Sequence, residues 1–386
     1  MVMELEERQA WVALASVEGV GGATLTRLVG QFSGARGVLE AAGSGRFARL
    51  ASAGERGGRL AAQVIAGIEA VARDPRPALA AVERLGLWTL TPMDAGYPAR
   101  FDVLGVLPAV LYGWGDPAAL EPAVAVAIVG TRRPTPLGRA LAARLARHLV
   151  GRSALIVSGL AIGIDGAAHA ATLEAGGRTV AIIGASHAQP GPRAHRALVA
   201  AIVERGGAVV SEMAPGKALA KGMFPRRNRL LAALGDAVLV VEAPALSGAI
   251  NTAHHALELG RPLFVAPGRP GDPTTAGCLR LLRETPARTL VGLSELDEDL
   301  DALGIGERHV VGAGATRNAV STGLGEVERA VAGVIARAPG SLESIVARTD
   351  LAPAAVASAV TLLQMRGLVR LVDGALLPMG PLLDGV

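Results

Sequence analysis

Cysteine, lysine, aromatic residues and long apolar runs are all scarce in this chain of 386 residues. The single cysteine, Cys278, excludes an intramolecular disulfide framework, cysteine-rich zinc sites and cysteine-held iron–sulfur clusters. Apolar runs such as 123–130 and 237–241 are much shorter than the roughly 18–20 residues that cross a bilayer. The acidic segment 1–10 lacks the apolar core of a signal peptide. We therefore expect a cytoplasmic protein with no membrane insertion.

Arginine supplies almost all of the basic charge. Among 38 basic residues, Lys217 and Lys221 are the two lysines, so the other 36 are arginines. A GC-rich coding sequence would produce this skew, but arginine also binds phosphate with a planar fork. The net charge of +4 permits an acidic partner such as nucleic acid without establishing one. Because the chain has five Phe, three Trp and two Tyr, phosphate contacts should outweigh base stacking in any nucleic-acid complex.

Short aliphatic runs alternate with helical segments from about residue 79 to residue 300. Each run is bounded by Gly, Pro or Asp, as expected for strands that are buried on both faces. Strand–helix alternation of this length predicts an α/β fold with a doubly wound parallel sheet. The six predicted strands are 124–129, 155–158, 179–183, 208–211, 237–241 and 262–266.

The first 75 residues indicate a small helical domain. Trp11, Leu14 and Val17 repeat at helical spacing, and the turn 19–22 contains three glycines. A glycine-rich turn between two short helices is typical of helix-hairpin-helix modules, in which backbone amides can bind a DNA phosphate. The alternative is a plain packing unit without DNA contact.

The C-terminal residues predict a second small domain. Three helical segments are followed by a hairpin with an Asp373-Gly374 turn, which indicates a winged helix. Such a domain binds duplex DNA or contacts a protein. The predicted domains are a helical domain at 1–75, a sheet domain at 76–305, a linker at 306–324 and a winged-helix domain at 325–386.

Glycine and small hydroxyl residues follow four of the predicted strands. Ligands of open parallel sheets bind beyond the carboxyl ends of the strands, and bare amides at helix N-termini bind anions. We therefore expect a phosphate-bearing ligand at this edge. The sequence lacks a P-loop lysine motif and a Gly-x-Gly-x-x-Gly turn, which disfavours a P-loop ATPase and a classical dinucleotide site. The four loops are 130–133, 158–165, 184–186 and 242–248.

The segment 221–229 is the most basic of the predicted loops. It contains Lys221, Phe224, Asn228 and three arginines. Basic charge around an aromatic ring suits single-stranded nucleic acid, because the charge follows the backbone and the ring can stack on a base. The alternative is a solvated loop that leads into a helix.

Groups for catalysis or metal binding are poorly arranged. Asp165 is expected to cap a helix, and the adjacent His254 and His255 face different directions, so they do not share a metal easily. Glu212 and Glu242 at strand ends could form a carboxylate pair. Because no nucleophile, base and orienting group occur together, we expect a protein that is not an enzyme and has no metal or cofactor.

Six ordered motifs run through the predicted sheet domain: 91–98, 111–113, 158–169, 224–229, 247–253 and 267–268. Together they resemble the bacterial DNA-processing protein A family (DprA, also called Smf) over about residues 88–292. The resemblance implies an extended Rossmann-like fold, an N-terminal helical module of helix-hairpin-helix or SAM-like type and a C-terminal winged helix. It also implies a homodimer that binds single-stranded DNA, protects incoming DNA and loads the recombinase RecA during natural transformation.

The resemblance also implies a DNA-binding site, carried over position by position. The loop 184–195 departs from the family pattern at Ser186, Gly191 and His195, so no contact is carried over from it. An alternative function is an enzyme on nucleotides or phospho-sugars with Glu242 or Asp165 as acid or base, which fold analogy alone supports. The expected DNA-binding residues are Gly130, Thr131, Arg132, Lys221, Phe224, Arg227, Asn228, Ser247 and Gly248.

Overall fold

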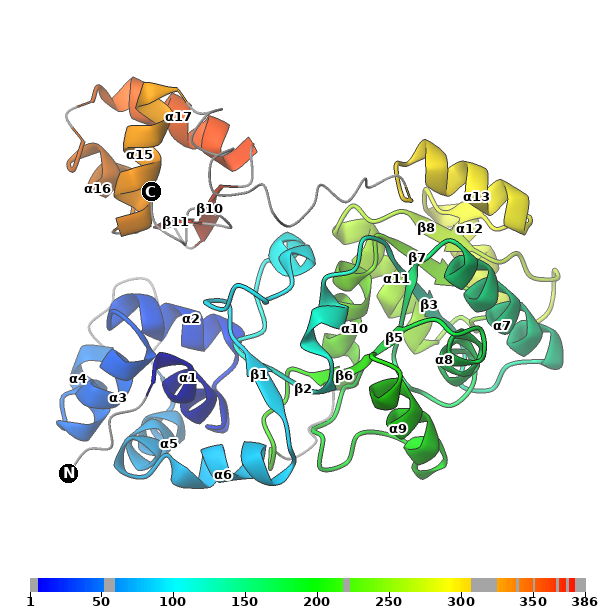
Figure 1. Cartoon of the computed structure of the whole chain (residues 1–386), viewed down its shortest axis with the longest axis horizontal. Helices are drawn as coiled ribbons and strands as arrows, with labels where there is room; N and C mark the ends of the chain where they lie inside the picture. The colour runs from blue at the N-terminus through cyan, green and yellow to red at the C-terminus, as the bar shows by residue number, and fades with distance from the viewer. Residues whose placement is uncertain are drawn as a thin grey trace. The chain divides into compact units, whose positions relative to one another are not determined.

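The computed structural model divides the chain into two compact units, Met1–Arg308 and His309–Val386. In Figure 1 the first unit contains a group of helices and a sheet with helices on both faces, and the second contains helices and a hairpin. No helix in the described part of the chain is long and apolar enough to span a membrane. The structure describes residues 6–51, 60–217, 223–306, 325–337, 340–349, 351–365, 368–372 and 375–378.

The sheet of the first unit has nine strands among the described residues. These strands are β1 (Trp88–Leu90), β2 (Leu111–Gly115), β3 (Ala125–Val129), β4 (Leu155–Ser158), β5 (Thr179–Ile182), β6 (Ala208–Ser211), β7 (Ala237–Val240), β8 (Leu263–Val265) and β9 (Arg288–Thr289). Their order across the sheet is β1-β2-β6-β5-β4-β3-β7-β8-β9. The seven strands β6-β5-β4-β3-β7-β8-β9 are parallel to one another. At the β6 end, β2 pairs antiparallel with β6, and β1 pairs antiparallel with β2. The six predicted strands correspond to β3–β8, so the predicted doubly wound α/β sheet is confirmed.

Helices cover both faces of this sheet. One face packs against α7 (Pro136–Gly151), α8 (Ile164–Glu174), α9 (Arg196–Glu204) and α13 (Leu293–Ala302). The other packs against α10 (Met223–Leu234), α11 (Gly248–Glu258) and α12 (Ala276–Glu284). Short 3-10 turns lie in the connections at η1 (Ala99–Val103), η2 (Pro117–Leu120) and η3 (Arg193–His195).

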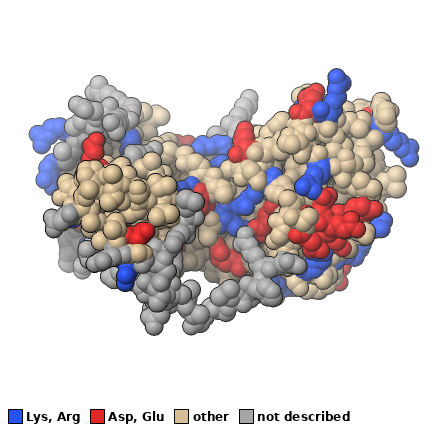
Figure 2. Space-filling view, turned by 90° about the horizontal axis from the view of Figure 1, so that it is seen from above, with Lys and Arg blue, Asp and Glu red and all other residues tan. Residues whose placement is uncertain are grey.

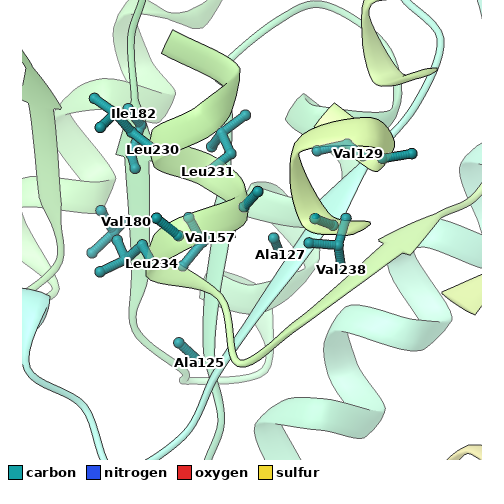
Figure 3. Packing of buried hydrophobic residues seen from close by; sticks show 14 of the residues in the cluster. Ala125, Ala127, Val129, Val157, Val180, Ile182, Leu230, Leu231, Leu234 and Val238 are labelled. Carbon is teal, nitrogen blue, oxygen red and sulfur yellow. The ribbon is translucent and has the colours of Figure 1, made fainter. Parts of the chain in front are cut away.

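The strand interior explains why both faces need helices. Successive residues of β3 point to opposite sides: Ala127 and Val129 belong to the core beneath α10, whereas Val126 and Ile128 belong to the core beneath α7 and α8. Leu231 of α10 belongs to the same core as the first pair (Figure 3). Because every one of these side chains is apolar and buried, removal of apolar surface from water stabilises both layers.

The N-terminal helices share a core with the edge of the sheet. Tyr112 of β2 is fully buried in the same cluster as Trp11 and Leu28. The glycine turn 19–22 also faces this junction, because Lys217 Nζ donates a hydrogen bond to the Val20 carbonyl at 3.0 Å. The helices are α1 (Glu7–Ala15), α2 (Gly22–Gln31), α3 (Ala35–Gly43), α4 (Phe47–Ala51), α5 (Ala62–Arg73) and α6 (Arg76–Arg84).

The second unit has the predicted winged-helix arrangement of three helices and a hairpin. Val331, Ile335 and Leu363 lie at the centre of its core and are fully buried. The predicted Asp373-Gly374 turn lies outside the described residues, as does the predicted linker beyond residue 306. The elements are α15 (Glu326–Arg337), α16 (Leu342–Val346), α17 (Pro353–Met365), β10 (Val369–Val372) and β11 (Ala375–Pro378).

Candidate nucleic-acid interface

A cleft of about 400 Å³ opens at the carboxyl ends of the central strands of the first unit. In the sheet, β3 lies between β4 and β7, so the chain leaves β3 on one side and later returns on the other. This is the topological switch point, where open α/β sheets bind their ligands. Seven of the nine predicted DNA-binding residues line the cleft: Gly130, Thr131, Arg132, Arg227, Asn228, Ser247 and Gly248.

The basic segment that leads into α10 is described in part. Lys221 lies outside the described residues, and so does the side chain of Phe224 in the first turn of α10, so both stay predictions. Arg226 is exposed. Arg229 instead forms an ion pair with Glu212 at 2.5 Å, and burial raises the pKa of that carboxyl while the arginine opposes the rise. Of these two described arginines, Arg226 is therefore exposed to a ligand, whereas the charge of Arg229 is paired with Glu212.

Gly130 and Thr131 form a turn that is locked between two elements. Thr131 N–H donates to the Glu242 carbonyl at 2.7 Å, and the Thr131 carbonyl accepts from Ile164 N–H at 3.2 Å. A Cβ on Gly130 would lie 2.5 Å from Ile164 Cγ1, so no larger residue fits without a shift of α8. The next two residues, Arg132 and Arg133, are exposed and line the cleft. The tight turn thus places two guanidinium groups at the rim of the cleft.

Arg227 uses its donors inside the protein. Arg227 is 7% exposed. Its Nη1 group donates hydrogen bonds to the Gly159 carbonyl, at 2.8 Å, and to the Ile182 carbonyl. Burial lowers the pKa of this guanidinium to about 10, with Asp165 opposing the change and Arg132 adding to it. The DNA contact that the resemblance implies for Arg227 stays a prediction; in the structure its side chain lines the cleft and joins α10 to the ends of β4 and β5.

Asn228 and the start of α11 form the opposite wall. Asn228 Nδ2 donates to the Gly248 carbonyl at 3.2 Å, which ties α10 to α11. Ser247 caps α11, since its Oγ accepts from Ala249 N–H at 3.2 Å. A Cβ on Gly248 would meet nothing within 4 Å, so packing does not require glycine there. The missing side chain instead leaves the backbone open to a ligand.

The two carboxylates of the enzyme alternative are held in place by local contacts. Glu242 is 3% exposed and accepts from Thr135 N–H and, at 2.8 Å, from Thr135 Oγ, the cap of α7. Asp165 lines the cleft but accepts from Ala161 N–H at 3.3 Å, and burial raises the pKa of its carboxyl against the opposing charge of Arg227. Both positions suit the support of loops and helix ends, so the geometry gives no specific support to acid–base catalysis.

The divergent loop 184–195 packs beside the cleft. His195 donates from Nδ1 to the Leu160 carbonyl at 3.0 Å, and its ring would overlap a Cβ on Gly166 at the start of α8. Ser186, Gly191 and His195 are absent from the lining of the cleft. The loop therefore contacts the segment 160–166 without lining the cleft.

Ten further residues line the cleft and were not among the nine expected, and three of them bear on the binding of a ligand. Arg133 follows Arg132, Leu246 is 99% exposed at the rim, and Asn251 lies one turn after Ser247 on α11. The spacing of four between Ser247 and Asn251 places both on one helix face and is visible in the sequence. Leu246 has no comparable signal, because a single leucine in a loop does not show its exposure.

The comparisons with known proteins agree with this geometry. The family model for DNA recombination-mediator protein A matches residues 88–301, and the model for the DprA winged helix domain matches residues 315–375. The DNA processing protein DprA of Bacillus subtilis is 35% identical over 222 residues, which cover 58% of this chain and 74% of that protein.

Two solved structures are also similar. DNA processing protein A (DprA) of Streptococcus pneumoniae aligns with a TM-score of 0.59 and 27% identity, over 80% of this chain and all of that one. DNA processing protein A of Helicobacter pylori, studied for its unique single-stranded DNA binding mode, aligns with a TM-score of 0.50 and 31% identity, over 56% of this chain and 96% of that one. The chain therefore belongs to the DNA recombination-mediator protein A family, also called DprA or Smf.

Proposed function

We propose that this protein binds single-stranded DNA through the switch-point cleft, protects incoming DNA and loads RecA onto it during natural transformation, without acting as an enzyme. The observation that carries the proposal is that the turn at Gly130, the open backbone at Gly248 and the exposed Arg132 and Arg133 meet at one cleft. Backbone amides and guanidinium groups together bind phosphate. The single-stranded DNA binding of the Helicobacter pylori relative supports the same ligand here.

The cleft is small, so a bound DNA strand would fill it and continue beyond it. Its volume of about 400 Å³ lies near the lower end of the range for small-ligand pockets, about 300–1,000 Å³. On the face drawn in Figure 2, basic side chains occur in separate small groups, and acidic side chains gather in a larger patch. We therefore expect DNA to follow a local path through the cleft, with further phosphates bound by basic residues near it.

The test is a titration with oligodeoxythymidines of increasing length at several salt concentrations. We expect the affinity to rise over several nucleotides and to fall linearly with the logarithm of salt concentration, with a slope of about −0.7 per neutralised phosphate. Duplex DNA of equal length serves as the comparison. Tight binding of a mononucleotide accompanied by turnover would contradict the proposal and favour the enzyme alternative.

The proposed partners need separate measurements. We propose that the protein acts as a homodimer, which analytical ultracentrifugation tests directly. RecA loading is tested by the rate at which RecA assembles on a single strand with and without the protein. The winged helix is proposed to contact duplex DNA or a protein; a chain ending at residue 306 that keeps its single-strand affinity but loses duplex affinity would favour duplex DNA.

A further inference from the structure

Asn251 lies on the wall of the cleft, and two residues of α10 fix its orientation. Its side chain is half-buried. Arg227 Nε–H donates to Asn228 Oδ1 at 3.2 Å. Because a guanidinium group has donors and no acceptor, the atom of Asn228 that faces it is the amide oxygen.

The amide nitrogen of Asn228 consequently faces α11. It donates to the Gly248 carbonyl at 3.2 Å and to Asn251 Oδ1 at 3.0 Å. The carbonyl can only accept, so it requires a nitrogen at this place independently of Arg227. Asn251 therefore turns its oxygen toward Asn228 and its nitrogen away from it.

The Asn251 Nδ2 group is left with two N–H donors that have no hydrogen-bond partner within the described part of the chain. The cleft around it favours an acceptor. Arg132 and Arg133 line the same cleft with donor-only side chains. Asp165, the acidic residue of the lining, is 6% exposed and accepts a backbone hydrogen bond. A ligand oxygen fits this environment, whereas a ligand donor has few partners.

The geometry points to Asn251 as a residue that donates its side-chain N–H groups to an acceptor oxygen of a bound DNA strand. Asn228 and Arg227 act as positioning residues, because they hold the Asn251 amide with its nitrogen free. This inference rests on the proposed single-strand binding. The acceptor is a phosphate oxygen or a base carbonyl, since both accept an N–H donor.

The first test replaces the donors and keeps the shape. Asn251→Asp retains an oxygen for Asn228 and replaces the NH2 group by a second carboxylate oxygen, so affinity for an oligodeoxythymidine should fall at least about 10-fold. Asn251→Ala should lower it about 3- to 10-fold and leave the salt slope unchanged, because no charge is lost. Gln63→Glu, the same change at an exposed amide on α5, is the control and should bind within about twofold.

A second oligonucleotide shows whether the acceptor oxygen belongs to a phosphate or to a base. On an oligonucleotide with abasic sites, an unchanged loss in Asn251→Ala identifies a phosphate oxygen, and disappearance of the loss identifies a base carbonyl. Variants that keep the thermal unfolding midpoint and bind both strands as the unaltered chain does would overturn the inference. If the unaltered chain itself binds no single strand, the proposed function has failed instead.

A double-mutant cycle tests whether Asn228 acts by positioning Asn251. Asn228→Asp cannot donate, so Asn251 must turn its nitrogen toward the new carboxylate and present oxygen to the cleft. We expect Asn228→Asp to cost more affinity in the unaltered chain than in the Asn251→Ala background. Equal losses in both backgrounds would show that Asn228 does not act through Asn251.

Discussion

At the residue scale, the arginines of the cleft divide into two roles. Arg132 is exposed at the rim, whereas Arg227 is buried and donates to two backbone carbonyls. An exposed guanidinium can neutralise a phosphate without breaking contacts inside the protein. Removal of a buried guanidinium, in contrast, removes internal hydrogen bonds. Substitution of the two residues should therefore change different measurable quantities.

Arg132→Ala should weaken single-strand binding on all base sequences and reduce the magnitude of the salt slope by about 0.7, because one phosphate contact is lost. Its free energy of unfolding should stay within about 0.5 kcal/mol of the unaltered chain. Arg144→Ala, at an exposed arginine of α7 outside the cleft, removes the same charge and is the control. Equal salt slopes in the two variants would contradict a phosphate contact at Arg132.

Arg227→Ala should instead lower the free energy of unfolding by at least about 2 kcal/mol, because hydrogen bonds to charged groups contribute about 1.5–3 kcal/mol each. The nearby carboxyl of Asp165 would also lose the charge that opposes its protonation. Single-strand affinity should fall because the cleft loses its shape, while the salt slope stays unchanged. Urea unfolding and salt titrations check both parts; an undiminished stability would show that the buried contacts contribute little.

At the element scale, the glycine turn at the start of α2 contacts the loop that precedes β2 and the loop that follows β6. A Cβ on Gly22 would lie 2.2 Å from the Leu107 carbonyl, a backbone atom that cannot move aside cheaply. Lys217 adds a hydrogen bond to the same turn, and burial lowers the pKa of its ammonium group. The sequence left open whether this turn contacts DNA or serves only for packing, and its approach to Leu107 becomes visible with the fold.

Gly22→Ala should therefore loosen the packing of α2 against the loop before β2 and lower the free energy of unfolding by about 1–3 kcal/mol. Gly30→Ala on the same helix is the matched control. A Cβ there meets nothing within 4 Å, so it should stabilise by about 0.5–1 kcal/mol. Hydrogen exchange of the α2 amides distinguishes the two, and equal exchange rates in both variants would exclude a close contact at Gly22.

The strands show which elements a sequence predicts well. Runs such as Val126–Val129 are aliphatic throughout, because both faces of a central strand are buried, and these strands were predicted. The missed strands β1, β2 and β9 are at or near the sheet edges: β1 has three half-buried residues, β2 contains two glycines, and β9 has two exposed residues. Their pairing depends on neighbours far along the chain, which local composition does not encode.

The cleft shows the same division. Glycine turns and the basic segment predicted its place, because carboxyl ends of parallel strands meet at one edge. The burial of Arg227 and the orientation of Asn251 depend on how α10 lies beside α11 and on the ends of β4 and β5. Such relations between elements distant in sequence require the three-dimensional structure.

At the scale of the whole molecule, two buried histidines tie stability to pH. His169 is fully buried and His187 is 2% exposed, and burial lowers their pKa values to about 3 and about 4. Below the ordinary pKa of about 6.5 the unfolded chain takes up protons that the folded chain does not bind. Stability from these groups is therefore fully present above about pH 6.5 and is lost as the pH falls.

Below about pH 6.5, each histidine should lower the free energy of unfolding by about 1.4 kcal/mol per pH unit. Between pH 7 and pH 5 the loss is about 2 kcal/mol for each histidine. The ring centroids of His187 and Trp114 lie 4.7 Å apart. His187→Phe keeps an aromatic ring at this place but removes the titrating group. Urea unfolding at the two pH values should show a loss about 2 kcal/mol smaller in the variant. Identical losses would mean that His187 takes up its proton in the folded state.

The position of β7 beside β3 also has a consequence for synthesis on the ribosome. Roughly 110 residues separate the two strands in the chain, so at about 5–20 residues per second β3 waits roughly 5–20 s for this neighbour. During that interval one edge of the future central strand has no partner and is open to wrong pairing. The cleft needs α11 as well, so a nascent chain acquires it only after residue 252 has been made. Truncated products shorter than this would compete for chaperones and would not compete for DNA.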